Sequence, residues 1–324
     1  MKPARQRRSW LWLGLAAVVL ALAGTHAAYQ ADMHTIQQRL NAGSRMAATS
    51  HGPMEYADLG SGPAVLVLHG AGGGHDQGAS MARAYGGEGF RWIVPSRFGY
   101  LRTPLPADAS TAAQADALLE LLDGLGLRRV AVLAMSGGVP PALQIASRHP
   151  TRVSALVLLS SAPYTPLSAR QQQLPMPGWM YQALFSSDFP YWLLQKAVPS
   201  SLQAIFDARA ELRAGQTPEE RAFVEQLVGS FLPVTQRMAG LGNEGAAVNP
   251  QARYSLERIV APALVIHARD DGINPFAFGE HTARFVPGAQ FMPLESGGHL
   301  LLGHTQAVRT RVNAFLRSHA AAGS

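Results

Sequence analysis

Short apolar runs, each ended by glycine, proline or polar residues, constrain the fold of this chain most strongly. The clearest are Ala64–Leu68, Arg91–Val94, Val130–Ala134, Ala155–Ser160, Ala263–His267 and Ala289–Pro293. These runs are too short for buried helices, and apolar side chains on both faces are typical of parallel strands that helices cover. The sequence therefore predicts an α/β fold with a mostly parallel sheet.

Two local predictions accompany this sheet. Tyr56–Leu59 and Ala64–Leu68 are separated by the turn-like sequence Gly60-Ser61-Gly62-Pro63, which predicts that one strand folds back on the other. Ala112–Leu125 has the apolar spacing of a helix, and Thr111 and Gln114 predict a capping box at its start.

The start of the sequence combines positive charge with an apolar run. The first eight residues hold four cations: Lys2, Arg5, Arg7 and Arg8. Ser9–Ala31 contains no Lys, Arg, Asp or Glu, and Trp10–Ala23 is almost continuously apolar. Residues 1–29 are therefore predicted to be an export signal or a membrane anchor, with residues 30–50 as a stem and the rest outside the cytoplasm. Whether the segment is cleaved stays open.

The overall charge does not indicate a nucleic-acid partner. The chain has 27 Lys and Arg against 21 Asp and Glu. Residues 1–28 hold four of those cations and no acid, so 23 cations face 21 acids in the remainder. Cysteine is absent, which excludes disulfides, a thiolate nucleophile and Cys-ligated zinc. Nothing in the sequence implies a cofactor or a metal, and a small-molecule substrate is expected.

Ala134-Met135-Ser136-Gly137-Gly138 follows a predicted strand and precedes the helical run Pro141–His149. Small residues two positions before and after Ser136 suit a tight strand-to-helix turn, because larger side chains would collide with the neighbouring strand and helix. The N-terminus of the helix would also stabilise negative charge beside the hydroxyl. Ser136 is therefore a candidate nucleophile.

A glycine-rich loop, His69-Gly70-Ala71-Gly72-Gly73-Gly74, follows the strand Ala64–Leu68. Glycines there allow backbone N–H groups to approach a ligand oxygen. The loop lacks the last glycine of a dinucleotide fingerprint, because His75 follows Gly74, and no acidic residue closes the second parallel strand. The loop therefore indicates an anion-stabilising backbone rather than a nucleotide site.

Two further polar groups follow predicted strands. Asp270 and Asp271 come after Ala263–His267, and His299 comes after Ala289–Pro293. Since open parallel sheets place their sites at the carboxyl ends of strands, Ser136, an aspartate and His299 are expected to converge.

These features resemble the α/β-hydrolase family over residues 54–160 and 257–318. The resemblance implies a Ser, acid, His triad in which Ser136 is the nucleophile and His299 the base, with backbone N–H groups of Ala71 and Gly137 forming the oxyanion hole. Asp271 matches the family acid better than Asp270, because it lies four residues before Pro275. Asp270 remains an alternative.

The resemblance places the hydrolase core in residues 51–161 and 257–320. Residues 162–256 contain many aromatics and no convincing strand, which predicts a helical cap over the site. The Trp179–Trp192 stretch is the most aromatic part of the cap. The candidate cap cations all lie outside it: Arg170, Lys196, Arg209 and Arg213. A serine hydrolase of small to medium apolar esters is the first hypothesis. A carbon-carbon hydrolase of ring-fission dienoates and a non-catalytic, membrane-tethered binding protein are the alternatives.

Overall fold

The computed structural model describes residues 4–162, 178–247 and 254–319, and the chain forms two units, Met1–Ala42 and Gly43–Ser324. The first unit is a single helix, α1 (Ala4–Ala42). Within it, Trp12–Ala42 has a mean hydropathy of 1.5 and is long and apolar enough to cross a membrane, by length and composition. One helix thus continues past residue 29, where the sequence predicted a boundary between anchor and stem.

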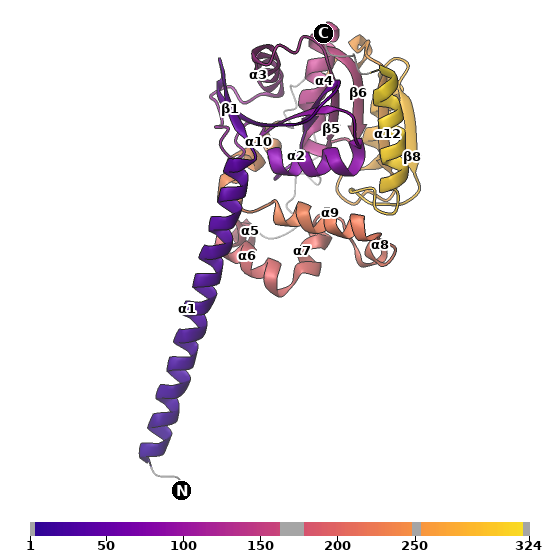
Figure 1. Ribbon diagram of the computed structural model, residues 1–324. Coiled ribbons are helices and arrows are strands. Elements are labelled where there is room, and N and C mark those ends of the chain that lie inside the picture. The colour runs from indigo at the N-terminus through magenta and orange to yellow at the C-terminus, as the bar shows by residue number, and fades with distance from the viewer. Residues whose placement is uncertain (1–3, 163–177, 248–253, 320–324) are drawn as a thin grey trace. The chain divides into compact units, whose positions relative to one another are not determined.

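The second unit contains an eight-stranded sheet in the order β1-β2-β4-β3-β5-β6-β7-β8 (Figure 1). The strands are β1 (Arg45–Thr49), β2 (Gly52–Gly60), β3 (Ala64–Leu68), β4 (Arg91–Pro95), β5 (Val130–Met135), β6 (Val153–Leu159), β7 (Ala263–Ala268) and β8 (Gln290–Leu294). β2 is antiparallel to β1 and β4, and every other pair is parallel. The predicted α/β fold with a mostly parallel sheet is confirmed.

β2 and β3 are not neighbours, so the predicted hairpin between them is wrong. β4 lies between the two strands, with Ile93 paired to Asp58 on one side and to Leu66 on the other. β3 is buried along its whole length and has parallel partners on both edges, β4 and β5. It therefore leaves no free edge for β2, which pairs instead with β4 and with the edge strand β1.

Helices cover the sheet and enclose its apolar side chains. α3 (Thr111–Gly124) and α4 (Val139–Arg148) share one apolar core with the strands, including Leu66, Val132 and Leu158. α2 (His75–Met81), α11 (Phe276–Phe285) and α12 (Thr305–His319) complete the layers. The N-cap of α3 is Ser110, whose Oγ accepts the N–H of Ala113 at 3.1 Å. The predicted capping box at Thr111 is therefore wrong, because the hydroxyl one residue earlier already satisfies the first turn.

Between β6 and β7, the described residues 178–247 contain helices and connecting turns but no strand. The α-helices are α5 (Gly178–Phe185), α6 (Asp188–Ala197), α7 (Pro199–Ile205), α8 (Ala210–Ala214), α9 (Pro218–Gly229) and α10 (Met238–Ala247). We refer to residues 178–247 as the cap, within the predicted insertion 162–256. Figure 1 shows α5–α9 gathered together, apart from the helices on the sheet. The ring of Phe231 lies 5.2–5.7 Å from those of Phe185, Tyr191 and Phe206, so aromatic packing organises the cap.

Candidate active site

Ser136 occupies the tight turn between β5 and α4. Its backbone φ is +51°, an uncommon conformation for a residue with a side chain, and Met135 before it is extended. The turn also needs the small residue at 138, because a methyl group on Gly138 would lie 2.3 Å from the carbonyl oxygen of Leu68 in β3. The residue pattern around Ser136 therefore has the steric cause that the sequence suggested.

Asp271 and His299 lie in contact beyond the ends of β7 and β8. His299 Nδ1 is 2.9 Å from Asp271 Oδ2 and 3.1 Å from Oδ1. Asp271 Oδ1 also accepts the backbone N–H groups of Ile273 and Asn274, at 2.9 and 2.8 Å. Burial alone would raise the pKa of Asp271, but His299, His267 and the Asn274 N–H outweigh it, and the pKa lies well below its usual range. The environment of Asp271 thus favours its ionised form.

Asp270, the alternative acid, points to a different partner. Its Oδ2 accepts from Arg209 at 2.9 Å, and its Oδ1 accepts the N–H of Gly298 at 2.9 Å. Of the two aspartates, Asp271 is therefore the one that the structure brings to His299.

The hydroxyl of Ser136 lies within reach of Asn274, whose Nδ2 is 3.5 Å from Ser136 Oγ. The same amide donates to the Ser160 carbonyl oxygen at 2.9 Å. Ser136 and His299 line one cavity, but the hydroxyl is not hydrogen-bonded to the imidazole in this state. Hydrogen bonds between catalytic groups often tighten only when substrate is bound.

The glycine-rich loop is held in place by buried polar side chains. His69 Nδ1 donates to the Gly70 carbonyl oxygen at 2.7 Å, and its Nε2 accepts the N–H of Arg97 at 3.0 Å. Burial and the adjacent Arg97 charge lower the pKa of His69, so its ring is neutral. The Gly70 N–H donates to Gln77 Oε1 at 3.0 Å. The guanidinium of Arg97 donates to the His69 and Gly70 carbonyl oxygens.

The two predicted oxyanion-hole residues lie next to each other. A methyl group on Gly137 would be 3.2 Å from the Ala71 nitrogen, so this nitrogen faces the start of α4. The same methyl group would be 2.8 Å from Glu244 Oε2 of the cap. Glu244 is ion-paired with Arg97 and accepts from the Tyr100 hydroxyl at 2.9 Å. No sequence pattern indicated that a cap carboxylate lies beside this turn.

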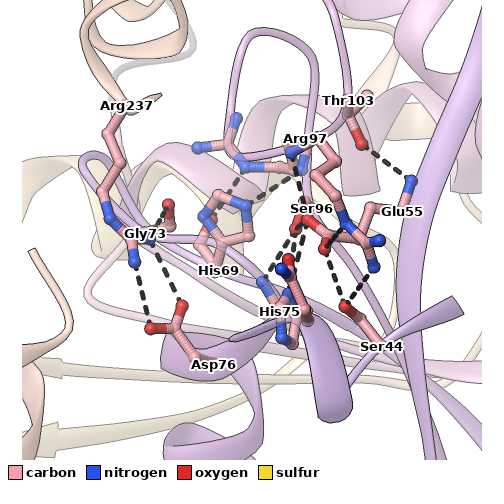
Figure 2. A network of polar contacts seen from close by, with 12 residues as sticks. Ser44, Glu55, His69, Gly73, His75, Asp76, Ser96, Arg97, Thr103 and Arg237 are labelled. Carbon is pink, nitrogen blue, oxygen red and sulfur yellow. Dashed lines mark hydrogen bonds and ion pairs between the residues drawn. The ribbon is translucent and has the colours of Figure 1, made fainter. Parts of the chain in front are cut away.

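Figure 2 shows the polar network on the other side of the loop. The fully buried Arg237 of the cap donates to the Gly73 carbonyl oxygen at 2.6 Å and to Asp76 Oδ2 at 3.0 Å. Phe231 also packs on the loop, because any side chain at Gly72 would overlap its ring. Cap and glycine-rich loop are therefore built as one packed structure.

Glu55 of β2 is the central acid of the same network (Figure 2). It accepts from Ser96 Oγ at 2.9 Å and from Arg102 Nε at 2.7 Å, and His75 Nδ1 lies 3.5 Å away. Burial raises its pKa, but hydrogen bonds and the His75 charge prevail and lower it to about 2. Ser96 thus supplies a hydroxyl that donates to this buried carboxylate.

A cavity of about 360 Å³ opens beside Ser136 and His299. Its apolar lining comes from the cap through Phe185, Tyr191, Ile205, Phe206, Leu227, Phe231 and Leu241, and from the core through Met81, Met135, Ile273 and Leu300. Among the described residues that line it there is no Lys or Arg. Of the four cap cations considered above, Arg209 binds Asp270, Arg213 binds Gln203 and Lys196 lies over the Trp192 ring. Arg170 lies outside the described residues.

Asp207 is a functional candidate that sequence analysis missed. It lies in the cap with φ +62°, and its Oδ2 accepts the N–H groups of Gly272 and His299 at 2.9 and 2.8 Å. Sixty or more positions separate it from both partners, so no local pattern could have indicated it. Within the described residues, no three His, Cys, Asp or Glu side chains are placed to hold a metal ion.

Comparison with known proteins agrees with this fold. A sequence profile of the alpha/beta hydrolase fold matches residues 63–303. The chain is similar to a pimeloyl-[acyl-carrier protein] methyl ester esterase of Aromatoleum aromaticum, with 30% identity over 79% of this chain and 98% of that relative. It is also similar to a 2-hydroxymuconate semialdehyde hydrolase of Pseudomonas putida, with 28% identity over 80% of this chain and 89% of that relative.

Among solved structures, an alpha/beta hydrolase fold protein from Nakamurella multipartita matches with 31% identity and a TM-score of 0.76. The match covers 85% of this chain and 99% of that protein. Since the family profile spans well over half of the sequence and the fold is the same, this chain is a hydrolase that belongs to the α/β-hydrolase fold family.

Proposed function

We propose that this protein is a serine hydrolase of small to medium apolar carboxylic esters. The observation that carries the proposal is the apolar cavity beside Ser136 and His299, whose described lining has no cation. An acyl chain in such a cavity would gain about 0.8 kcal/mol for each buried methylene. A substrate carboxylate would instead lose its hydration without gaining a charged partner.

In the proposed mechanism, Ser136 Oγ turns from Asn274 to His299 when an ester fills the cavity. His299 takes the hydroxyl proton as Oγ attacks the ester carbonyl carbon, and then donates that proton to the departing alcohol. Asp271 orients the imidazole through Nδ1 and offsets its positive charge. The Ala71 and Gly137 N–H groups stabilise the oxyanion. Water then attacks the acyl carbon and gives a proton to His299. His299 returns this proton to Ser136 Oγ as the carboxylic acid leaves.

The carbon-carbon hydrolase hypothesis retains support from the similarity to the P. putida enzyme. A ring-fission dienoate carries a carboxylate, which is ordinarily bound by arginine or a comparable donor. None of the three described candidate cations lines the cavity, and each contacts another side chain: Lys196 lies over Trp192, Arg209 binds Asp270 and Arg213 binds Gln203. Their positions weigh against this alternative. A non-catalytic binding protein would not need the contact by which Asp271 orients the imidazole of His299.

The test is a substrate profile of the purified protein. Esters with acyl chains from acetate to decanoate would be compared with a ring-fission dienoate under the same conditions. We expect kcat/KM to rise with chain length until the cavity is filled. Faster turnover of the dienoate than of every ester would favour carbon-carbon cleavage, and no turnover of any substrate would favour a binding protein.

We also propose that α1 delivers the hydrolase outside the cytoplasm, as an anchor or a cleaved signal. The support is the apolar segment Trp12–Ala42 behind a basic N-terminus. A reporter enzyme that works only outside the cytoplasm, fused after Ser324, should be active. Activity of a reporter that works only in the cytoplasm would contradict this topology. The mass of the mature protein would distinguish cleavage from anchoring.

A further inference from the structure

Asp271 contacts a second imidazole besides that of His299. His267 in β7 places Nε2 3.1 Å from Asp271 Oδ2, the oxygen that His299 Nδ1 approaches to 2.9 Å. We propose that His267 is a positioning residue, which holds the Asp271 carboxylate in line with His299 and shares its negative charge. This inference rests on the proposed function of the Ser136 site.

The position of the His267 hydrogen follows from its surroundings. Nε2 faces two acceptors, Asp271 Oδ2 and the Asn274 carbonyl oxygen at 3.0 Å, so this nitrogen carries a hydrogen. The ring is fully buried, and Nδ1 has no hydrogen-bond partner. A methyl group on Gly279 of α11 would lie 2.5 Å from Nδ1, so packing leaves this nitrogen no room for a water-sized group on that side. The polar contacts of His267 are therefore all to the loop that carries Asp271.

The two oxygens of Asp271 are held in different ways. Oδ1 accepts the N–H groups of Ile273 and Asn274, which belong to the same loop. Oδ2 is shared by the two imidazoles. His267 comes from the sheet, so it is the side chain that fixes the loop carboxylate to the rigid part of the fold.

The other charged groups near this loop have their own partners. Arg209 binds Asp207 and Asp270, at 3.0 and 2.9 Å. Arg269 lies over the Phe276 ring at 4.5 Å and binds Glu295 at 3.0 Å. Asp207 accepts the backbone N–H of His299 and does not contact its ring. The charge that a change at His267 would affect is thus that of Asp271 with His299.

The test compares His267→Leu, which removes the donor, with His267→Gln, whose amide nitrogen can take the place of Nε2. The full chain would be assayed on one neutral ester, with kcat/KM measured against pH. We expect His267→Leu to lower kcat by roughly tenfold, the scale of one hydrogen bond to a charged group. We also expect the acid limb of its profile to move to higher pH, because a carboxylate that no longer shares its charge holds the proton on His299 more tightly. His267→Gln should recover most of the rate and the original limb.

A double-mutant cycle with Asp271→Asn keeps the test decisive if His267→Leu also alters stability. In the Asp271→Asn background, the loss of His267 should have little further effect on kcat. An equal loss of kcat in both backgrounds would overturn the proposal. Equal losses of kcat for His267→Leu and His267→Gln, with no shift in the acid limb of the pH profile, would also overturn it. In either case His267 would be a packing residue. If Ser136→Ala abolishes activity while His267→Leu matches the unaltered protein, this inference alone fails. If Ser136→Ala stays active, the proposed function fails.

Discussion

The core and the cap contribute to the cavity in opposite ways. In the core, Ser136, Asp271 and His299 each follow a parallel strand, and backbone geometry or hydrogen bonds fix them. In the cap, the cavity-lining side chains are almost all apolar, and aromatic packing around Phe231 holds them. Under the proposed function, the core carries out the reaction and the cap selects the molecule that reaches it. Changes in the core should therefore reduce kcat for every substrate, and changes in the cap should reorder substrates.

The largest effect should come from Ser136→Ala, with a loss of roughly 10⁴ to 10⁶ in kcat, as when a triad nucleophile is removed. The variant should also lose covalent labelling by a fluorophosphonate probe. Ser147→Ala is the matched control, since Ser147 is buried on α4 and bonds only the Leu143 carbonyl oxygen. Labelling that survives in Ser136→Ala would place the nucleophile elsewhere.

The two adjacent aspartates should differ next most strongly. Asp271→Asn should lower kcat by about 10⁴, because the amide no longer stabilises the required imidazole tautomer. Asp270→Asn should cost at most about tenfold, since Asp270 binds Arg209 and the Gly298 N–H. Steady-state kinetics of both variants on one ester measure the difference. The opposite ranking would assign the acid to Asp270.

Acid should destabilise the core through Glu55. The pKa of Glu55 is lowered to about 2, so its stabilising effect is complete above about pH 4.5 and is lost as pH falls toward 2. The shift corresponds to about 3 kcal/mol. Chemical unfolding between pH 6 and pH 2.5 measures it. Glu55→Gln should unfold more easily at pH 6 and lose much of the acid dependence; an unchanged dependence would assign it to other groups.

A cap substitution should give the smallest effect. It should change the order in which esters are preferred, measured as kcat/KM against acyl chain length. Leu227→Trp would fill part of the cavity and move the preferred acyl chain to a shorter length. Two methylenes displaced from the cavity correspond to roughly fifteenfold in kcat/KM. Leu193→Trp is the control, because Leu193 is exposed on the cap and does not line the cavity. An equal loss for all chain lengths would show that Leu227 supports the core rather than selecting the substrate.

The sequence was sufficient to place the groups whose position depends on nearby residues. Ser136 lies in a turn with small residues at positions 134, 137 and 138, and Asp271 and His299 each lie in the loop after an apolar strand. The position of β2 was not predictable in this way, since strand order depends on which edges other strands occupy. The same applies to Asp207 and Glu244, whose partners lie far away in the chain. His267 did leave a signal: it is a polar residue near the end of an apolar strand, four positions before the acid.

The close packing of Phe231 on Gly72 has a consequence for engineering this hydrolase. Caps of related enzymes are attractive parts to exchange when a new substrate range is wanted. Here a methyl group on Gly72 would lie 1.9 Å from the Phe231 ring, and one on Gly74 would lie 2.8 Å from an Arg237 nitrogen. A transplanted cap would therefore meet a loop shaped for different side chains. Chimeras should therefore exchange residues 69–76 together with the cap.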